Sequence, residues 1–311
     1  MTLRVHIDTD CGVDDALALA MLARAREAVE VGSVSAVFGN TYVDQAAANA
    51  RGVLRLAGCG AEVYIGAGSG LARRRVERMR PAHGVDGLNG AGFSQRWKLP
   101  ELDRGHGTGL LAFVARRKIA GLFLGPLTNL AQGLLDDPAA FRDWRPTVMA
   151  GAFTVEGKAT GGGDFNTWSD PEALQRVLDA GVRPRLVPLD VSSQVTLTAA
   201  DLVAGATACG SPLSGRLSRA ARPYMDFHGQ VWGLDGACHP HDAVAAAALI
   251  APEAFRFEPA RLRVTVDGLR QGRIERIEGP ANAEVCVSVD VATVERLILK
   301  VLFGEGALAA P

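Results

Sequence analysis

The chain of 311 residues is 48% hydrophobic and 22% charged, which is typical of a folded globular protein and excludes a largely disordered chain. Its 33 Lys and Arg residues nearly balance 34 Asp and Glu residues, and the one run of like charge is Arg73–Arg75. This balance argues against nucleic acid or an anionic membrane as the main partner. No targeting pattern or apolar run of about 20 residues is visible, and the cysteines are scattered, so we expect a soluble cytoplasmic protein with reduced thiols.

Short β-branched runs alternate with Ala- and Leu-rich helical stretches from the first residues onward. This alternation predicts an α/β fold, a single domain over residues 1–311 with an open, mostly parallel β-sheet flanked by helices. In chain order the expected strands are Leu3–Asp8, Val31–Phe38, Glu62–Gly66, Ile119–Leu124, Thr147–Gly151, Arg185–Asp190, Arg261–Val266 and Glu284–Asp290. The expected helices are Asp14–Glu27, Asp44–Leu56, Thr108–Arg116, Thr128–Leu135, Pro171–Ala180, Leu213–Ala221, Asp242–Leu249 and Val291–Phe303.

Three stretches interrupt this alternation. His83–Gly92 and Gly157–Gly163 are rich in glycine and are predicted to be loops over a site. The stretch Arg222–Pro240 is predicted to be irregular, and it is interpreted either as a mobile flap over a ligand or as ordinary packing. Its aromatic and histidine side chains are Tyr224, Phe227, His228, Trp232 and His239.

Four aspartates stand within eight residues, where the first expected strand ends and the first expected helix begins: Asp8, Asp10, Asp14 and Asp15. Carboxylates this close repel one another in a low-dielectric cleft unless a cation neutralises them. Open α/β proteins also place ligands at the carboxyl edge of their parallel strands. Capping of the helix explains one or two of the four aspartates, so the pattern predicts a hard divalent cation.

Two other motifs share part of this pattern. An EF-hand loop needs glycine at its sixth position, whereas Gly12 stands at the fifth position counted from Asp8. Phosphatases that form an aspartyl-phosphate also place D-x-D after a first strand. That interpretation leaves Asp14 and Asp15 unexplained, and we find no later lysine and acidic pair for it. A metal-dependent phosphatase is therefore the outside alternative.

Six blocks of sequence, in the same order, make the chain resemble the nucleoside hydrolase family of the inosine-uridine-preferring type. The first has the form D-x-D-x-G-x-D-D-A-x-A. The blocks are Asp8–Ala18, Phe38–Asn40, His83–Leu88, Gly125–Leu130, Asp164–Asn166 with Asp170–Ala173, and His241–Asp242. The resemblance implies an α/β domain that hydrolyses the N-glycosidic bond of ribonucleosides to ribose and a free base.

The resemblance also implies a calcium ion at the bottom of the site. Asp10, Asp15 and Asp242 resemble its carboxylate ligands and Thr128 its backbone carbonyl ligand, while Asp8 would support the cluster from beside or behind it. Oxygen-only ligands suit Ca²⁺ better than Zn²⁺. The residues that resemble the family's ribose contacts are Asp14, Asn40, Asp164 and Asn166.

Cleavage of a ribosyl C–N bond passes through an oxocarbenium-like sugar, so catalysis needs negative charge near ribose, an activated water and a better leaving group. The resemblance implies that Asp10 accepts a proton from a water molecule bound to calcium and that Asp14 contacts the ribose hydroxyls. His241 is expected to protonate the leaving base, because the pKa of histidine lies near neutrality. Taken alone, His241 is more simply interpreted as a cap of the expected helix Asp242–Leu249. His83, Tyr224 and His239 are expected near the base, where His83 has a surface loop as its alternative.

The chain departs from the family pattern before the Asp164–Asn166 block. The family usually has a Gly-Asn pair and a Glu there, whereas this chain has Gly157, Lys158 and Asp164. This difference keeps two alternatives open: a hydrolase of another or 5′-modified N-riboside, and a non-catalytic nucleoside- or ribose-binding homologue. The resemblance implies a homodimer or homotetramer and leaves the preferred base open.

Overall fold

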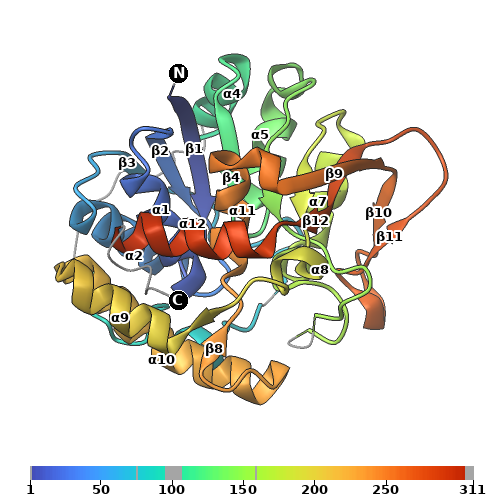
Figure 1. The fold of residues 1–311 in the computed structure, drawn as a ribbon. Helices are drawn as coiled ribbons and strands as arrows, with labels where there is room; N and C mark the ends of the chain where they lie inside the picture. Colours follow the sequence, from blue (N-terminus) through green and yellow to red (C-terminus); the bar gives the residue numbers. More distant parts are fainter. Residues whose placement is uncertain (1, 75, 95–106, 158–159, 305–311) are drawn as a thin grey trace.

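A mostly parallel eight-stranded sheet forms the centre of the structure, a computed structural model that describes residues 2–74, 76–94, 107–157 and 160–304 (Figure 1). The strand order is β3-β2-β1-β4-β5-β6-β12-β9, and only β9 runs antiparallel to its neighbour. The predicted α/β fold with an open sheet is therefore confirmed. The strands are β1 (Leu3–Thr9), β2 (Val29–Ala36), β3 (Glu62–Ile65), β4 (Ala120–Phe123), β5 (Thr147–Met149), β6 (Arg185–Val187), β9 (Phe255–Ala260) and β12 (Ala283–Val289).

Helices cover both faces of this sheet. Successive residues of β4, β5 and β6 join different hydrophobic clusters, because side chains alternate between the two faces of a strand. One cluster includes α1 (Val13–Arg24), α2 (Val43–Leu56), α11 (His241–Ile250) and α12 (Val291–Phe303). The other includes α4 (Gly107–Arg116), α5 (Thr128–Asp136) and α7 (Pro171–Asp179).

Shorter elements complete the described chain, and none of the helices in this part is long and apolar enough to cross a membrane. Two small antiparallel pairs lie outside the central sheet: β7 (Leu197–Thr198) with β8 (Ala237–Cys238), and β10 (Leu262–Val264) with β11 (Ile274–Arg276). The remaining helices are α3 (Arg80–His83), α6 (Phe165–Ser169), α8 (Leu189–Ser192), α9 (Ala199–Cys209) and α10 (Pro212–Trp232), with 3₁₀ turns at Pro138–Phe141, Pro252–Ala254 and Gly268–Arg270.

The structure corrects two of the predicted elements and adds a strand that was missed. The expected strand Arg261–Val266 is β10 of a hairpin, and the missed strand is β9, at one edge of the central sheet. The predicted irregular stretch from Arg222 is helical as far as Trp232, because α10 continues through Pro223. Proline removes a backbone donor inside a helix, but the buried face of α10 on both sides of it keeps the helix packed.

Candidate active site

The turn between β1 and α1 builds the floor of the site. After Thr9 the chain passes Asp10 and enters α1 through Cys11, a residue in the left-handed region with φ 36°. Gly12 follows, and a Cβ there would lie 2.6 Å from side-chain nitrogens of Asn40 and His83. Only glycine leaves room for these two side chains against the turn, which explains the glycine of the D-x-D-x-G sequence.

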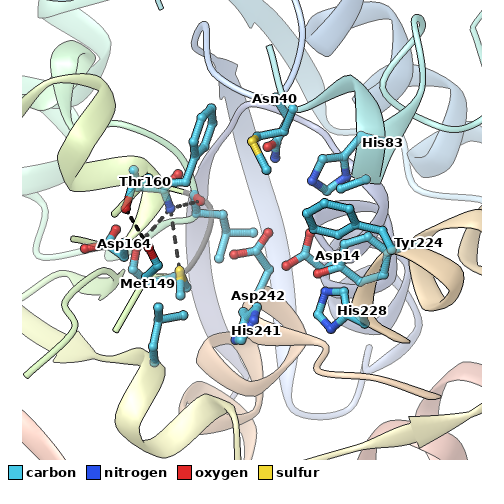
Figure 2. Close-up of a pocket in the computed structure, with 18 of the residues that line it drawn as sticks. Asp14, Asn40, His83, Met149, Thr160, Asp164, Tyr224, His228, His241 and Asp242 are labelled. Carbon is cyan, nitrogen blue, oxygen red and sulfur yellow. Dashed lines mark hydrogen bonds between the residues drawn. The ribbon is translucent and has the colours of Figure 1, made fainter. Parts of the chain in front are cut away.

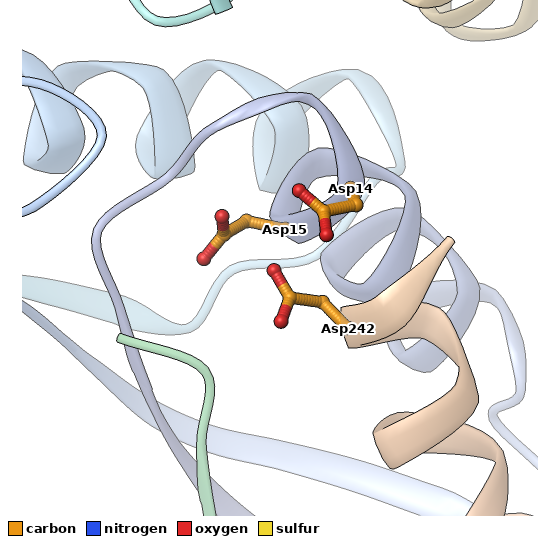
Figure 3. Close-up of side chains that lie close together, drawn as sticks. All are labelled: Asp14, Asp15 and Asp242. Carbon is orange, nitrogen blue, oxygen red and sulfur yellow. The ribbon is translucent and has the colours of Figure 1, made fainter. Parts of the chain in front are cut away.

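Three buried carboxylates meet at this turn: Asp14, Asp15 and Asp242 (Figure 3). One oxygen of each lies within 4.8 Å of the others. Asp14 and Asp15 stand in the first turn of α1 and Asp242 in the first turn of α11, where helix dipoles favour negative charge. Burial and mutual repulsion nevertheless raise the pKa of Asp242 well above its usual range, and they also raise the pKa of Asp14.

Asp10 lies beside this trio. Its Oδ2 accepts a hydrogen bond from the backbone N–H of Asn40 at 2.6 Å, and its Oδ1 accepts one from Asn40 Nδ2 at 3.1 Å. Burial and the charge of Asp15 raise the pKa of Asp10. Gly39 leaves room for the same carboxylate, because a Cβ at this position would lie 1.9 Å from Asp10 Oδ2.

A cavity with about 680 Å³ of empty space, part of it open to solvent, lies next to the cluster (Figure 2). Its acidic end is formed by Asp14, Asn40, Asn166 and Asp242. Its aromatic end is formed by His83, Tyr224, Phe227, His228 and Trp232, and His241 also lines the cavity. The two ends adjoin, because Tyr224 lies beside Asp14 (Figure 2), so the cavity offers polar oxygens and flat rings to neighbouring parts of a ligand.

The structure does not bring Thr128 to this cavity. Thr128 is the first residue of α5, where its carbonyl is committed to the helix, and its hydroxyl donates to Asp170 at 2.6 Å. The residue of the same sequence block that lines the cavity is Leu124, at the end of β4, whose carbonyl accepts from Asn166 Nδ2 at 2.6 Å. The assignment of a metal-binding carbonyl to Thr128 stays a prediction.

Asp8 and Asp164 have hydrogen-bond partners outside the trio. Asp8 accepts hydrogen bonds through Oδ2 from Ser35 and Asn129 behind the floor, while its buried Oδ1 has no partner among the described residues, and burial raises its pKa to about 7. Asp164 lines the cavity, but its two oxygens accept from the backbone N–H groups of Gly151 at 2.7 Å and Thr167 at 3.0 Å. Asp164 therefore holds the loop and α6 in place.

The histidines are held neutral. Burial lowers the pKa of His83 to about 3, and its Nδ1 accepts from the backbone N–H of Val13 at 3.0 Å. His241 pairs through Nδ1 with Ser192 Oγ at 2.8 Å. Burial, with His228, His239 and His83 nearby, lowers the pKa of His241 well below its usual range, so the expected pKa near neutrality is wrong.

His239 is not among the residues that line the cavity, where it was expected. His239 packs behind the cavity, between the rings of Trp232 and His241, and does not line it. Its Nδ1 pairs with the Val195 carbonyl at 3.0 Å. Lys158 lies outside the described residues, so the structure does not address its role.

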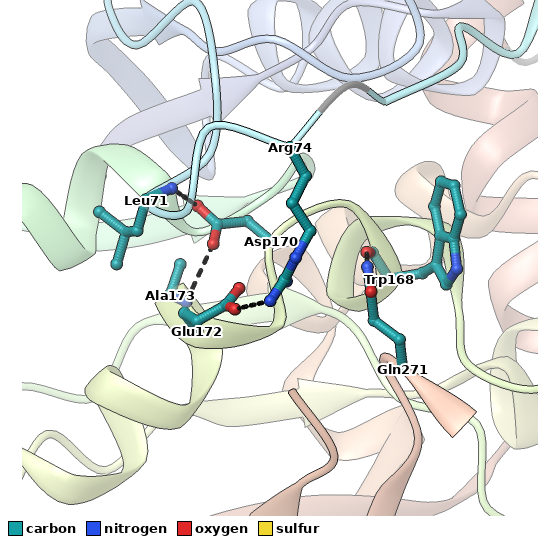
Figure 4. A network of polar contacts seen from close by, with 7 residues as sticks. All are labelled: Leu71, Arg74, Trp168, Asp170, Glu172, Ala173 and Gln271. Atoms are coloured by element: carbon teal, nitrogen blue, oxygen red, sulfur yellow. Dashed lines mark hydrogen bonds and ion pairs between the residues drawn. The ribbon is translucent and has the colours of Figure 1, made fainter. Parts of the chain in front are cut away.

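Two acidic side chains anchor the loops that border the cavity. Asp190 accepts hydrogen bonds from three consecutive backbone N–H groups, those of residues 153–155, and thereby fixes the start of the Gly157–Gly163 loop. Asp170 accepts from the N–H groups of Leu71 and Ala173 and from the Thr128 hydroxyl, and Glu172 pairs with Arg74 (Figure 4). The block Asp170–Ala173 is thus an anchor for the chain that approaches His83.

Comparison with known proteins identifies the family of the chain. A model of the inosine-uridine preferring nucleoside hydrolase family matches residues 5–296. The chain belongs to this family. It is 32% identical to a probable uridine nucleosidase 2 of Oryza sativa over 274 residues, which cover 86% of this chain and 80% of the relative. It is 29% identical to the non-specific ribonucleoside hydrolase RihC of Escherichia coli over 317 residues, covering 97% and 99% of the two chains.

Solved nucleoside hydrolases share the whole fold. A plant nucleoside hydrolase superposes with a TM-score of 0.88 at 25% identity, covering 97% of this chain and 99% of the other. A purine-preferring ribonucleoside hydrolase from Gardnerella vaginalis has the same TM-score at 22% identity, covering 98% and 100%. Membership in the family supports hydrolysis of the N-glycosidic bond of nucleosides as the activity of this chain.

The floor of this nucleoside hydrolase suits a metal ion. Its donors are buried carboxylate oxygens. The negative charges of these carboxylates repel one another, so a bound cation would relieve their repulsion. The sequence prediction named Asp10, Asp15 and Asp242 as ligands, whereas the closest trio contains Asp14 in place of Asp10. The apolar cavity residues Met79, Met149 and Phe165 were missed, because no spacing in the sequence distinguishes them from core residues.

Proposed function

We propose that this chain is a calcium-dependent ribonucleoside hydrolase that releases ribose and a free nucleobase. The observation that carries the proposal is the group of buried carboxylates that adjoins the aromatic end of the same cavity. Acidic groups of this density suit a cation and a sugar diol, whereas flat rings suit a nucleobase. The family of the chain agrees with this assignment.

The residues assigned to calcium are Asp10, Asp15 and Asp242, with the carbonyl of Leu124 in place of Thr128. When bound, calcium supplies positive charge that acidifies a water molecule and orients the ribose diol. The Leu124 carbonyl is a suitable neutral ligand because it lies at the cavity beside Asn166. Asp10 is assigned the proton of the attacking water, and the two hydrogen bonds from Asn40 hold its carboxylate in one orientation.

The ribose is assigned to Asp14, Asn40 and Asn166. Asn166 donates through Nδ2 to the carbonyls of Leu124 and Met149, which leaves its Oδ1 to accept from a ribose hydroxyl. Asp14 supplies a carboxylate next to the sugar, where it stabilises the positive charge that develops in the transition state. A 2′-deoxy sugar would leave these buried groups unpaired, so it is expected to react much more slowly.

His241 is assigned to stabilise the leaving base. Because burial keeps this imidazole neutral, its role is that of a hydrogen-bond donor to the base as the C–N bond breaks. The bond between His241 Nδ1 and Ser192 Oγ fixes the ring, and its Nε2, which has no hydrogen-bond partner among the described residues, is assigned to the base. His83 and Tyr224 border the same end of the cavity.

The position of Asp8 speaks against the phosphatase alternative. A phosphatase would need Asp8 at the cavity, but Asp8 is bonded to Ser35 and Asn129 and is not among the residues that line it. A substrate with a modified 5′ end stays an alternative, because Lys158, which suggested it together with Asp164, lies outside the described residues. The common ribonucleosides, which the family supports, are the substrates to test first.

The test is release of free ribose from inosine, adenosine, guanosine, uridine and cytidine, with and without a calcium chelator, beside Asp10→Ala. We expect ribose from at least one nucleoside, loss of activity with the chelator and its return with added calcium. Asp10→Ala is expected to be inactive. Calcium binding without ribose release from any nucleoside would refute hydrolysis and leave a binding role.

A further inference from the structure

One histidine of the aromatic end has its proton position fixed by the backbone. His228 lies on α10, is 2% exposed, lines the cavity and stands 4.3 Å from the ring of Tyr224. Its Nδ1 accepts the backbone N–H of His239 at 3.2 Å. A backbone amide can only donate, so Nδ1 carries no proton. Burial lowers the pKa of His228 to about 3, so the neutral ring carries its single proton on Nε2.

His83 is arranged in the same way on the other element that borders Tyr224. Its ring lies 5.2 Å from that of Tyr224, and its Nδ1 accepts the Val13 N–H. Neither Nε2 has a hydrogen-bond partner among the described residues, and neither is among the unpartnered polar atoms enclosed by protein. Two N–H groups are therefore left for a ligand, because a donor without a partner is costly once the cavity is filled.

We propose that His228 is a specificity-determining residue, whose Nε2–H donates a hydrogen bond to an exocyclic carbonyl oxygen of the nucleobase. The inference rests on the proposed function, which places the base at the aromatic end. With its tautomer fixed by the N–H of His239, His228 cannot accept from an amino group at the same position. Bases with a carbonyl there are favoured over bases with an amino group.

The experiment compares kcat/KM for inosine with adenosine and for uridine with cytidine, in the wild type, His228→Phe and His228→Gln. Phenylalanine keeps a ring and removes the donor, whereas glutamine keeps an amide that both accepts and donates. 4-Nitrophenyl β-D-ribofuranoside serves as a reference substrate without a base, and melting curves establish that each variant is folded. Inosine is also compared with purine riboside, which has hydrogen in place of the carbonyl.

We expect His228→Phe to reduce the preference for the carbonyl base about fivefold to tenfold, the value of one neutral hydrogen bond, with a smaller loss on the nitrophenyl riboside. His228→Gln is expected to retain most of the preference. Purine riboside should lose a similar factor against inosine in the wild type but not in His228→Phe. If His228→Phe does not fold, the wild-type comparison of inosine with purine riboside still decides the inference.

Two results would overturn the inference. Unchanged base preferences in folded His228→Phe, or equal rates for inosine and purine riboside in the wild type, would show that His228 makes no bond to the base carbonyl. Failure of the wild type to release 4-nitrophenol and to cleave any nucleoside would overturn the proposed function itself, and the inference with it. Cleavage of the nitrophenyl riboside therefore separates the two failures.

Discussion

Asp170→Ala should destabilise the protein more than the loss of any partly exposed ion pair near it. Asp170 is 2% exposed and accepts three hydrogen bonds, from Leu71 N at 2.9 Å, Thr128 Oγ1 at 2.6 Å and Ala173 N at 3.2 Å. The bond to Ala173 is an N-cap, worth about 1 kcal/mol, and the other two donors would lose their acceptor at about 1–2 kcal/mol each. The total expected loss in the free energy of unfolding is about 3–5 kcal/mol.

Calorimetry of the calcium-free protein is the assay. For a chain of this length, that loss corresponds to a decrease in Tm of about 5–8 °C. Glu172→Gln is the matched control on the same turn, because its ion pair with Arg74 is partly exposed and worth at most about 1 kcal/mol. Since Asp170 anchors the chain that approaches His83, KM should also increase in Asp170→Ala. A decrease in Tm no larger than that of Glu172→Gln would refute the anchoring role.

Three further predictions follow from individual contacts. Gly39→Ala should abolish calcium binding measured by calorimetry, because its Cβ would lie 1.9 Å from Asp10 Oδ2; unchanged affinity would contradict the role of Asp10. Gly52→Ala should lower Tm, because its Cβ would lie 2.1 Å from a backbone carbonyl. Gly215→Ala, on an open surface of α10, should instead raise the free energy of unfolding by about 0.5–1 kcal/mol. Equal effects of the two substitutions would contradict the packing argument. Hydrogen bonds lower the pKa of Asp190 despite its burial, so its stabilisation is present above the ordinary value of 3.8 and is lost as pH falls through the lowered value. Melting curves against pH should therefore converge for Asp190→Asn and the wild type in acid, and parallel curves would be evidence against this.

The fold class was predictable because its signals are local. Alternation of strand and helix patterns indicates parallel pairing, and each stretch had to bury its own apolar face. Prediction was wrong where packing overrides local preference. Pro223 favours the end of a helix, but Tyr224, Met225 and His228 extend the buried face of α10 beyond it. The antiparallel edge strand β9 was missed because its pairing with β12 depends on chain geometry far from it in sequence.

The position of the site was predictable and its detailed chemistry was not. Asp10, Asp14 and Asp15 lie within six residues, so any fold of this turn keeps them together. The choice between the carbonyls of Leu124 and Thr128 depends on where β4 ends and α5 begins, which residue types do not specify within four positions. The family resemblance named the block, and which of its carbonyls would bind a metal stays a prediction.

The sequence by itself determined the alternating α/β pattern, the run of aspartates and the glycine that lets the turn close. These features depend on neighbours a few residues apart, so backbone preference and charge repulsion suffice to read them. Tertiary structure alone decided that Asp242 joins the cluster, that Asp8 lies behind it and that His239 is excluded from the cavity. It also decided that the histidines are neutral, since the pKa of a side chain depends on its burial and on charges brought near by packing.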